Sequence, residues 1–357
     1  MNIDFHYGVI YVVARLAGMV PADAETVAHA CQYVDDATTD GVLVFRTGET
    51  YERFASAHSM HDYQNAQNSL NRLVWAPFHF LPAGTGQTLE ERAVCRPDSE
   101  VARSVVRHAI RAAGAANSLH RLGVTLHAYV DTWAHQGFSG IKSDFNRVRD
   151  IESADMTSAQ WGERIKQFAG HLFAEVETDL LSEIFPLGHG AALHYPDLPW
   201  GEWSYTNTQG VRVHRRNLPE FLAAADMAYR VVRGFLSKQE QFESLPGLPD
   251  ETKRALELLL LTNRSGDPDL RLETFNGSVA SGQIPGLREL IPQYIAKGDG
   301  SWKHRGTGLS TVDDGDEEPV YSPEFESSDY RYFHDAVKEH RFVVTQDILP
   351  QAGLRIA

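Results

Sequence analysis

Apolar residues recur every three or four positions along most of the chain, which is the spacing of one buried face of an α-helix. The pattern predicts helices over residues 6–18, 21–38, 62–75, 98–137 with a break near Gly114, 157–185, 218–236, 250–261 and 328–341. One short strand is expected at 42–45, within the otherwise polar stretch 39–60. We therefore expect an all-α fold, a multi-helix bundle with long irregular loops and a metal cluster between its helices.

Two segments lack this periodicity. Residues 186–217 are rich in glycine, proline and aromatic residues, a composition typical of loops. Residues 298–327 are polar and acidic, and we expect a flexible connection there. These breaks suggest a helical metal-binding core domain over residues 1–240 and a helical or irregular C-terminal appendage, 241–357, packed on the core.

Composition narrows the range of partners. The chain has 357 residues, of which 42% are hydrophobic, enough for a substantial core. Its net charge of −15 argues against a stable nucleic-acid complex, because phosphate backbones require clustered Lys and Arg. A small phosphorylated substrate held by metal ions stays compatible with this charge. No leader and no apolar run of about 18 residues are seen, so we expect a cytoplasmic protein without a transmembrane segment.

Only two cysteines, Cys31 and Cys95, are present, and they form no CxxC pair. We therefore expect neither a disulfide framework nor a thiolate zinc site. Histidine is the informative residue type, with 16 in the chain.

The stretch LHAYVDTWAHQGFSG, residues 126–140, carries His127, Asp131 and His135 at intervals of four. A helix turns 100° per residue, so these three side chains share one face, which is otherwise apolar. Imidazole nitrogen and carboxylate oxygen are ligands that zinc accepts, and we predict a metal site. The alternative is an ordinary polar helix face. His171 and Glu175 repeat the spacing of four, although such a pair alone is more often found on a surface.

Further candidate ligands lie earlier in the chain. Asp35 follows the apolar stripe of its predicted helix and should face inward, where an uncompensated carboxylate is costly. Asp35 could equally be a buried residue that caps a backbone amide. His6 enters the first helix, and Asp4 beside it is a second candidate.

His58, His61 and His79 are candidates for one further metal ligand. We prefer His61 to His58, because His61 directly precedes an aspartate at a predicted helix start. His79 lies between two phenylalanines and is as readily a packed histidine as a ligand.

The loop GHGAALHYPDLPW supplies candidates for catalysis. His194 and Asp197 could lie over the mouth of the metal site as substrate contacts, as a general acid or as extra ligands. The alternative is a rigid turn formed by Pro196 and Pro199.

These residues form an ordered set along residues 4–175: His6, Asp35, His61, His127-x-x-x-Asp131, His135 and His171-x-x-x-Glu175. The order resembles that of the metal ligands in the zinc-dependent phospholipase C and P1 nuclease superfamily. The segments DFHYG and QYVDDAT also resemble a bacterial family of unknown function.

The superfamily resemblance implies an all-helical, metal-dependent hydrolase of phosphodiesters or phosphomonoesters. It implies two or three zinc ions, with iron or manganese as alternatives, and Asp35 as a bridging ligand or the residue that orients the attacking water. The sequence departs from the superfamily in two ways. It lacks the amino-terminal tryptophan that binds metal, for which Asp4 is a candidate substitute, and His135 comes two residues early. A two-metal arrangement is therefore also expected.

Three other functions stay open. An HD-type phosphohydrolase would use the doublet His61-Asp62, with His6 before it and Asp131 after it. A di-iron oxygenase is less favoured, because paired Glu-x-x-His motifs are absent. A helical binding protein with incidental histidines would hold no stoichiometric metal. The sequence gives no prediction of oligomeric state.

Overall fold

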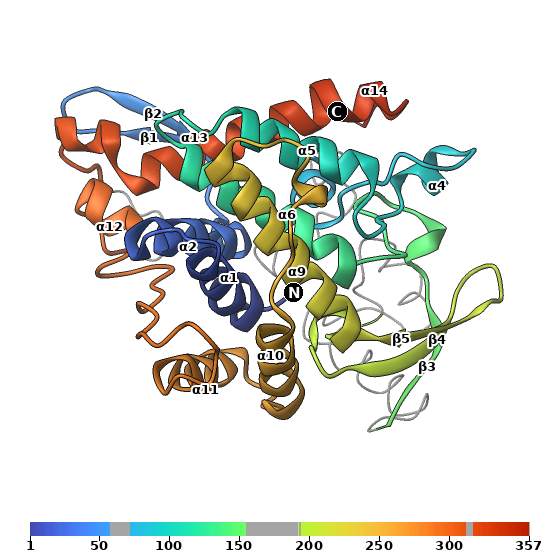
Figure 1. Ribbon diagram of the computed structural model, residues 1–357. Coiled ribbons are helices and arrows are strands. Elements are labelled where there is room, and N and C mark those ends of the chain that lie inside the picture. Colours follow the sequence, from blue (N-terminus) through green and yellow to red (C-terminus); the bar gives the residue numbers. More distant parts are fainter. Residues whose placement is uncertain (58–71, 155–191, 193, 312–316, 357) are drawn as a thin grey trace, which may run out of the picture.

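The computed structural model describes residues 1–57, 72–154, 192, 194–311 and 317–356. Helices dominate this part of the chain (Figure 1). The α-helices are α1 (Ile10–Leu16), α2 (Pro21–Asp36), α3 (Arg72–Val74), α4 (Leu89–Ala93), α5 (Glu100–Arg111), α6 (Ser118–Ala134), α9 (Asn217–Ser237), α10 (Asp250–Thr262), α11 (Pro268–Ala280), α12 (Trp302–Thr307), α13 (Asp329–Phe342) and α14 (Leu349–Gln351). Three π-helical segments are η1 (Asp4–Val9), η3 (Trp75–His79) and η10 (Val343–Ile348), and four 3-10 turns are η4 (Asp144–Asn146), η7 (Tyr195–Asp197), η8 (Phe242–Ser244) and η9 (Pro323–Ser327).

Local sequence explains several helix ends. Pro21 is the first residue of α2. At this position its fixed φ suits the helix, and its missing N–H breaks no hydrogen bond within the helix. The Ser99 hydroxyl accepts a hydrogen bond from the Ala102 N–H at the start of α5. The break expected near Gly114 is the turn between α5 and α6.

Helix α6 is the centre of the fold and packs against α2, α5, α9 and α13 (Figure 1). It crosses α2 at Gly123, where an added Cβ would lie 2.5 Å from the Val27 carbonyl oxygen and 2.6 Å from the Ala30 Cβ. Such distances are far below van der Waals contact, so only glycine allows this approach. The backbones of α2 and α6 consequently lie unusually close.

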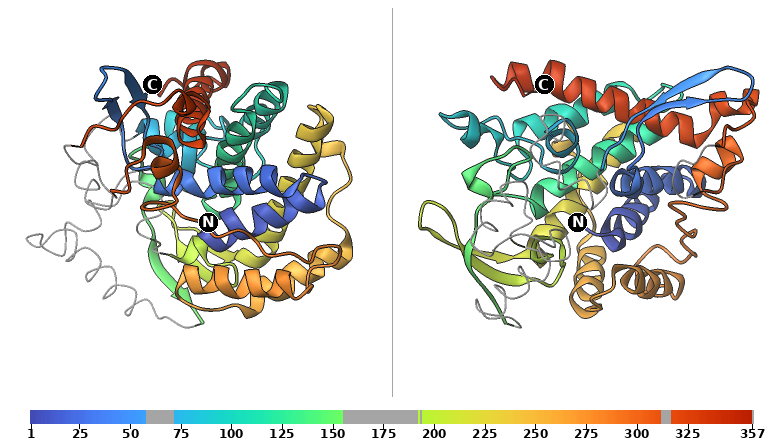
Figure 2. Two further views of the ribbon diagram at one scale, coloured as in Figure 1. Left: turned by 90° about the vertical axis from the view of Figure 1, so that its left-hand side faces the viewer. Right: turned by 180° about the vertical axis from the view of Figure 1, so that it is seen from behind.

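Residues 241–357 share the hydrophobic core of the preceding residues. Leu256 of α10 and Phe275 of α11 belong to the same buried cluster as Val12 of α1 and Leu126 of α6. In Figures 1 and 2, α10 and α11 lie at one end of the molecule and α13 and α14 at the opposite end. The segment 298–327 contains α12 and η9, whose Trp302 and Phe325 are buried.

The all-α prediction is wrong, because two small antiparallel sheets accompany the helices in the described part of the chain. One is the hairpin of β1 (Gly41–Val44) and β2 (Thr50–Arg53), at the short strand that was expected. The other pairs β3 (Arg149–Ser153), β4 (Glu202–Thr206) and β5 (Arg212–Arg216) in sequential order.

The second sheet includes most of the late part of segment 186–217, which we predicted to be loop. Its strands are short, and β5 reads RVHRR, so no apolar run or clean alternation marks β5. Cross-strand hydrogen bonds to β4 define it instead. In the part of the chain that the structure describes, none of the helices has the length and apolar character needed to cross a membrane.

Candidate metal centre

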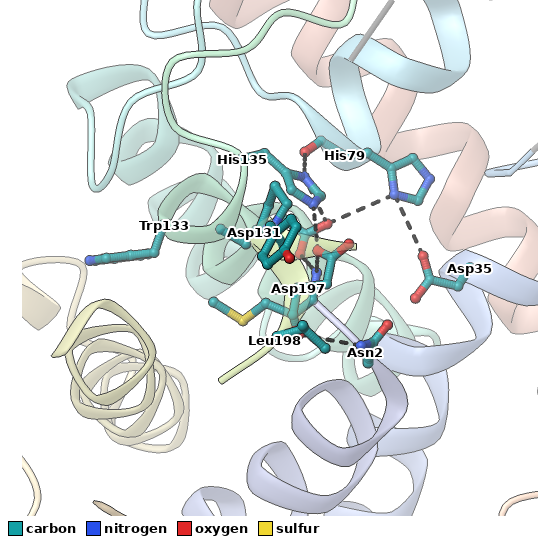
Figure 3. A network of polar contacts seen from close by, with 12 residues as sticks. Asn2, Asp35, His79, Asp131, Trp133, His135, Asp197 and Leu198 are labelled. Atoms are coloured by element: carbon teal, nitrogen blue, oxygen red, sulfur yellow. Dashed lines mark hydrogen bonds and ion pairs between the residues drawn. The ribbon is translucent and has the colours of Figure 1, made fainter. Parts of the chain in front are cut away.

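Helix α6 presents the predicted row of His127, Asp131 and His135 to the interior, and all three are buried. Figure 3 shows Asp131 and His135 of this row. Asp131 is the middle member, with its Oδ2 3.3 Å from the Nε2 of His127 and 3.5 Å from the Nδ1 of His135. The spacing of four residues therefore gathers these groups on one side of the helix.

His6 joins this row to helix α2. Its Nδ1 lies 3.1 Å from Asp35 Oδ2, and its Nε2 lies 3.0 Å from Asp131 Oδ1. His6 lies on the π-helical segment η1, and His79 is the last residue of the π-helical segment η3. Such widened turns are frequent at functional sites, because they turn side chains out of the regular helical register.

Three of the imidazoles are held by backbone carbonyls. His127 Nδ1 donates to Cys31 O at 2.7 Å, and His79 Nε2 donates to Ser56 O at 2.8 Å. His135 Nδ1 donates to His79 O at 2.6 Å. A carbonyl oxygen only accepts, so these nitrogens carry the protons, and when such a ring is neutral its other nitrogen carries a lone pair. This arrangement is the one that fixes metal-binding histidines.

The free nitrogens of two rings face each other. His127 Nε2 lies 3.2 Å from His79 Nδ1, with Asp35 Oδ1 3.6 Å from each of them. Two lone pairs and a carboxylate at these distances repel one another unless a cation lies among them. His127 belongs to two groups whose ligand atoms all lie within 4.8 Å of one another: His6, His127 and Asp131, and Asp35, His79 and His127.

Electrostatics fit cation binding as well. Burial lowers the pKa of His127 to about 4, with a contribution from His6, so this ring is neutral at neutral pH. Burial alone would raise the pKa of Asp131, but the surrounding His135, Met1 amine and His6 hold it well below its usual range. Asp131 Oδ2 is buried and accepts no hydrogen bond within the described structure. Nitrogen and oxygen donors without thiolate suit zinc, iron or manganese.

The amino group of Met1 lies at this centre, which sequence reasoning missed. It donates to Asp131 Oδ1 at 2.7 Å and lies 3.1 Å from Asp197 Oδ1. Burial works against this charge, but Asp131 and Asp197 raise the pKa of the amine to about 11. Residue type gives no signal for such a contact, because a backbone amine has no side-chain identity.

Asp197, predicted as a catalytic residue, lies beside the cluster on turn η7. Its Oδ1 is 3.2 Å from His135 Nε2, and its carbonyl oxygen accepts a hydrogen bond from the Asn2 side chain at 3.3 Å (Figure 3). His194 begins the same turn and is exposed.

The structure places Asp4 elsewhere. Both of its carboxylate oxygens accept from the buried guanidinium of Arg271, at 2.9 and 3.1 Å. Asp4 is therefore an ion-pair partner of helix α11. The candidates His58, His61, His171 and Glu175 lie outside the described residues. His79, which we had treated as a packed histidine or a ligand, joins His6, Asp35, His127, Asp131 and His135 in the cluster.

Residues 1–348 match the protein family DUF6765, which is described as a family of unknown function. The chain belongs to this family. No curated protein and no solved structure matches the chain.

Proposed function

We propose that this member of the DUF6765 family is a metal-dependent hydrolase of phosphoesters that uses two divalent cations, with zinc as the favoured metal. The observation that carries the proposal is the pair of facing imidazole nitrogens, His127 Nε2 and His79 Nδ1, 3.2 Å apart with carboxylates on either side. A protein interior holds such a group stably only when a cation compensates it. His127 Nε2 can bind one cation, and the ligands of the other three-residue group would hold the second one.

Bound cations would lower the pKa of a water molecule and hold the phosphate oxygens for an in-line displacement. The chain's own residues set the geometry. His6 lies between Asp35 and Asp131, so that Nδ1 can donate to Asp35 while Nε2 faces Asp131 and the cluster. The backbone carbonyls of Cys31 and Ser56 hold the rings of His127 and His79.

Asp35 lies on the open side of the cluster. Its side chain is 33% exposed, whereas the side chains of His6, His127 and Asp131 are at most 1% exposed. Substrate and water therefore reach the cluster beside Asp35, which we assign to orienting the attacking water. Asp197, 12% exposed, borders the other end near His135.

The phosphoester class rests on the ligand order shared with the phospholipase C and P1 nuclease superfamily. His6, Asp35, His127, Asp131 and His135 are the described members of that order, and their convergence supports the resemblance. A binding protein with incidental histidines would have no need to bury His6, His127, Asp131 and His135 beside one another.

Elemental analysis of the purified protein, followed by a substrate panel, tests the proposal. We expect two equivalents of zinc, iron or manganese per chain. We expect hydrolysis of bis(p-nitrophenyl) phosphate or p-nitrophenyl phosphate that a chelator abolishes and added metal restores. p-Nitrophenyl acetate serves as the control ester without phosphorus.

Three results would contradict the proposal. Protein without stoichiometric metal would indicate a binding protein. Iron with oxygen consumption but no phosphoester hydrolysis would indicate an oxygenase. A metal-loaded protein that hydrolyses only the acetate ester would overturn the phosphoester assignment.

A further inference from the structure

One buried asparagine, Asn217, holds the turn that carries Asp197. Its Nδ2 donates to the carbonyl oxygens of Tyr195 at 2.6 Å and Leu198 at 2.8 Å. These two carbonyls bracket Asp197 in the sequence. The Oδ1 of Asn217 accepts from the indole N–H of Trp203 at 3.2 Å, so the side-chain amide uses both its donor and its acceptor sides.

The backbone of Asn217 completes the frame. Its N–H donates to Gly201 O at 2.9 Å. This hydrogen bond connects the segment that follows the turn to the start of α9. A Cβ at Gly201 would lie 2.7 Å from Asn217 Nδ2 and 3.1 Å from Leu198 O. Only glycine at this position lets the amide reach the turn.

We infer that Asn217 is a positioning residue that sets Asp197 at the candidate metal centre; this inference rests on the proposed function. The partners of Asp197 have anchors of their own and do not follow it if the turn moves. His135 is bound through its Nδ1 to His79 O at 2.6 Å, and the Met1 amine is bound to Asp131 Oδ1 at 2.7 Å. The distance from Asp197 Oδ1 to His135 Nε2, 3.2 Å, therefore depends on where Asn217 holds the turn.

The substitution Asn217→Asp tests this role. It keeps the size of the side chain but places a carboxylate oxygen against the carbonyls of Tyr195 and Leu198, which it cannot bind. Titration with Co²⁺ alone, followed through its visible absorption, reports affinity and ligand geometry. We expect Co²⁺ binding to weaken by about 10- to 100-fold with an altered spectrum, the range typical of residues that support metal ligands.

A double-mutant cycle separates positioning from general damage. Asp197→Ala should weaken Co²⁺ binding to a similar degree, and Asn217→Asp should add little in the Asp197→Ala background. The matched control is Asn146→Asp, because Asn146 is equally buried and donates to two backbone carbonyls, those of Ser139 and Ile141. The effect of Asn146→Asp on Co²⁺ binding should add fully to the effect of Asp197→Ala.

A crystal structure of metal-free Asn217→Asp tests the inference independently of metal binding. We expect the turn to be displaced and the contact between Asp197 and His135 to be lost. Should this variant fail to fold, Gly201→Ala replaces it in the Co²⁺ titration and in the crystal structure, because the added Cβ would contact the side-chain amide of Asn217. A turn in its original place, or additive losses in the cycle, would overturn the role of Asn217. Wild-type protein that binds no Co²⁺ would overturn the proposed function instead, while the crystal structure still decides on Asn217.

Discussion

His127 Nε2 lies 3.2 Å from His79 Nδ1, although the two residues are 48 positions apart in the chain. Each ring gives its proton to a backbone carbonyl on the far side, Cys31 O for His127 and Ser56 O for His79. When both rings are neutral, imidazoles held in this way present lone pairs to each other, which is unfavourable without a cation. This pair is the centre of the candidate site.

The shared position of His127 leads to a prediction on metal stoichiometry. His127 belongs to both three-residue groups, but its one unprotonated nitrogen, Nε2, can bind only one cation, so His127→Ala and His79→Ala should each lose at least one metal ion. Asp131→Ala should also lose metal and phosphodiesterase activity while keeping most of the helical circular dichroism signal. Elemental analysis of each variant measures the loss.

His194→Ala is the control for these variants, because His194 is exposed and lies on the nearby turn. It should keep its full metal content. Full metal content in both His127→Ala and Asp131→Ala would refute the assigned ligands.

The helix crossing at Gly123 predicts a stability effect. Gly123→Ala places a Cβ 2.5 Å from Val27 O and should lower the free energy of unfolding by about 1–3 kcal/mol, since the packed backbones must separate. It should also weaken metal binding, because His127 is one turn further along α6. Gly114→Ala is the control, with no atom within 4 Å of the new Cβ. Chemical denaturation of both variants makes the comparison, and equal stabilities would show that the close approach has no energetic consequence.

The ion pair of Asp4 and Arg271 is buried on both sides, with side chains 4% and 1% exposed. Arg271→Met leaves the carboxylate of Asp4 without its partner and should cost about 3–5 kcal/mol of unfolding free energy. The double variant Asp4→Leu, Arg271→Met should recover much of this loss, because no unpaired charge is left in the interior. Urea denaturation measures both.

Metal content is the second measurement on these variants. The double variant should keep its metal, since both oxygens of Asp4 bind Arg271 and neither reaches the cluster. Loss of metal from the folded double variant would indicate that Asp4 is a metal ligand in the wild-type protein.

His29 predicts a dependence of stability on pH. Burial, together with Arg305, lowers the pKa of His29 to about 3, while an unfolded histidine titrates near 6.5. Below pH 6.5 the unfolded state therefore binds more protons at this position, and stability falls as the pH drops toward 3. The contribution is about 1.4 kcal/mol per pH unit over that window.

The variant His29→Phe isolates this contribution. Phenylalanine keeps the stacking on Trp302, whose ring centroid lies 3.9 Å from that of His29, but it takes up no proton. Unfolding free energies at pH 7, 6 and 5 should therefore decline less steeply in the variant than in the wild-type protein. Parallel declines would mean that His29 is protonated in the folded state.

Helical periodicity predicted much of the fold. The helices α2, α5, α6, α9, α10 and α13 lie within four residues of the predicted ranges, because each has an apolar stripe that is buried in the core. Helix α11 and the sheet of β3, β4 and β5 were not predicted. The short strand RVHRR has no apolar pattern of its own, and its pairing with the preceding strand β4 defines it.

The sequence by itself determined that His127, Asp131 and His135 share one face of a helix, since a spacing of four residues has this consequence in any helix. Only the tertiary structure decided which groups meet that face. It brought His79 and the Met1 amine into the cluster and paired Asp4 with Arg271. Local spacing governs direction within one element, whereas the meeting of different elements depends on how their side chains pack, as at the crossing of α2 and α6 beside Gly123.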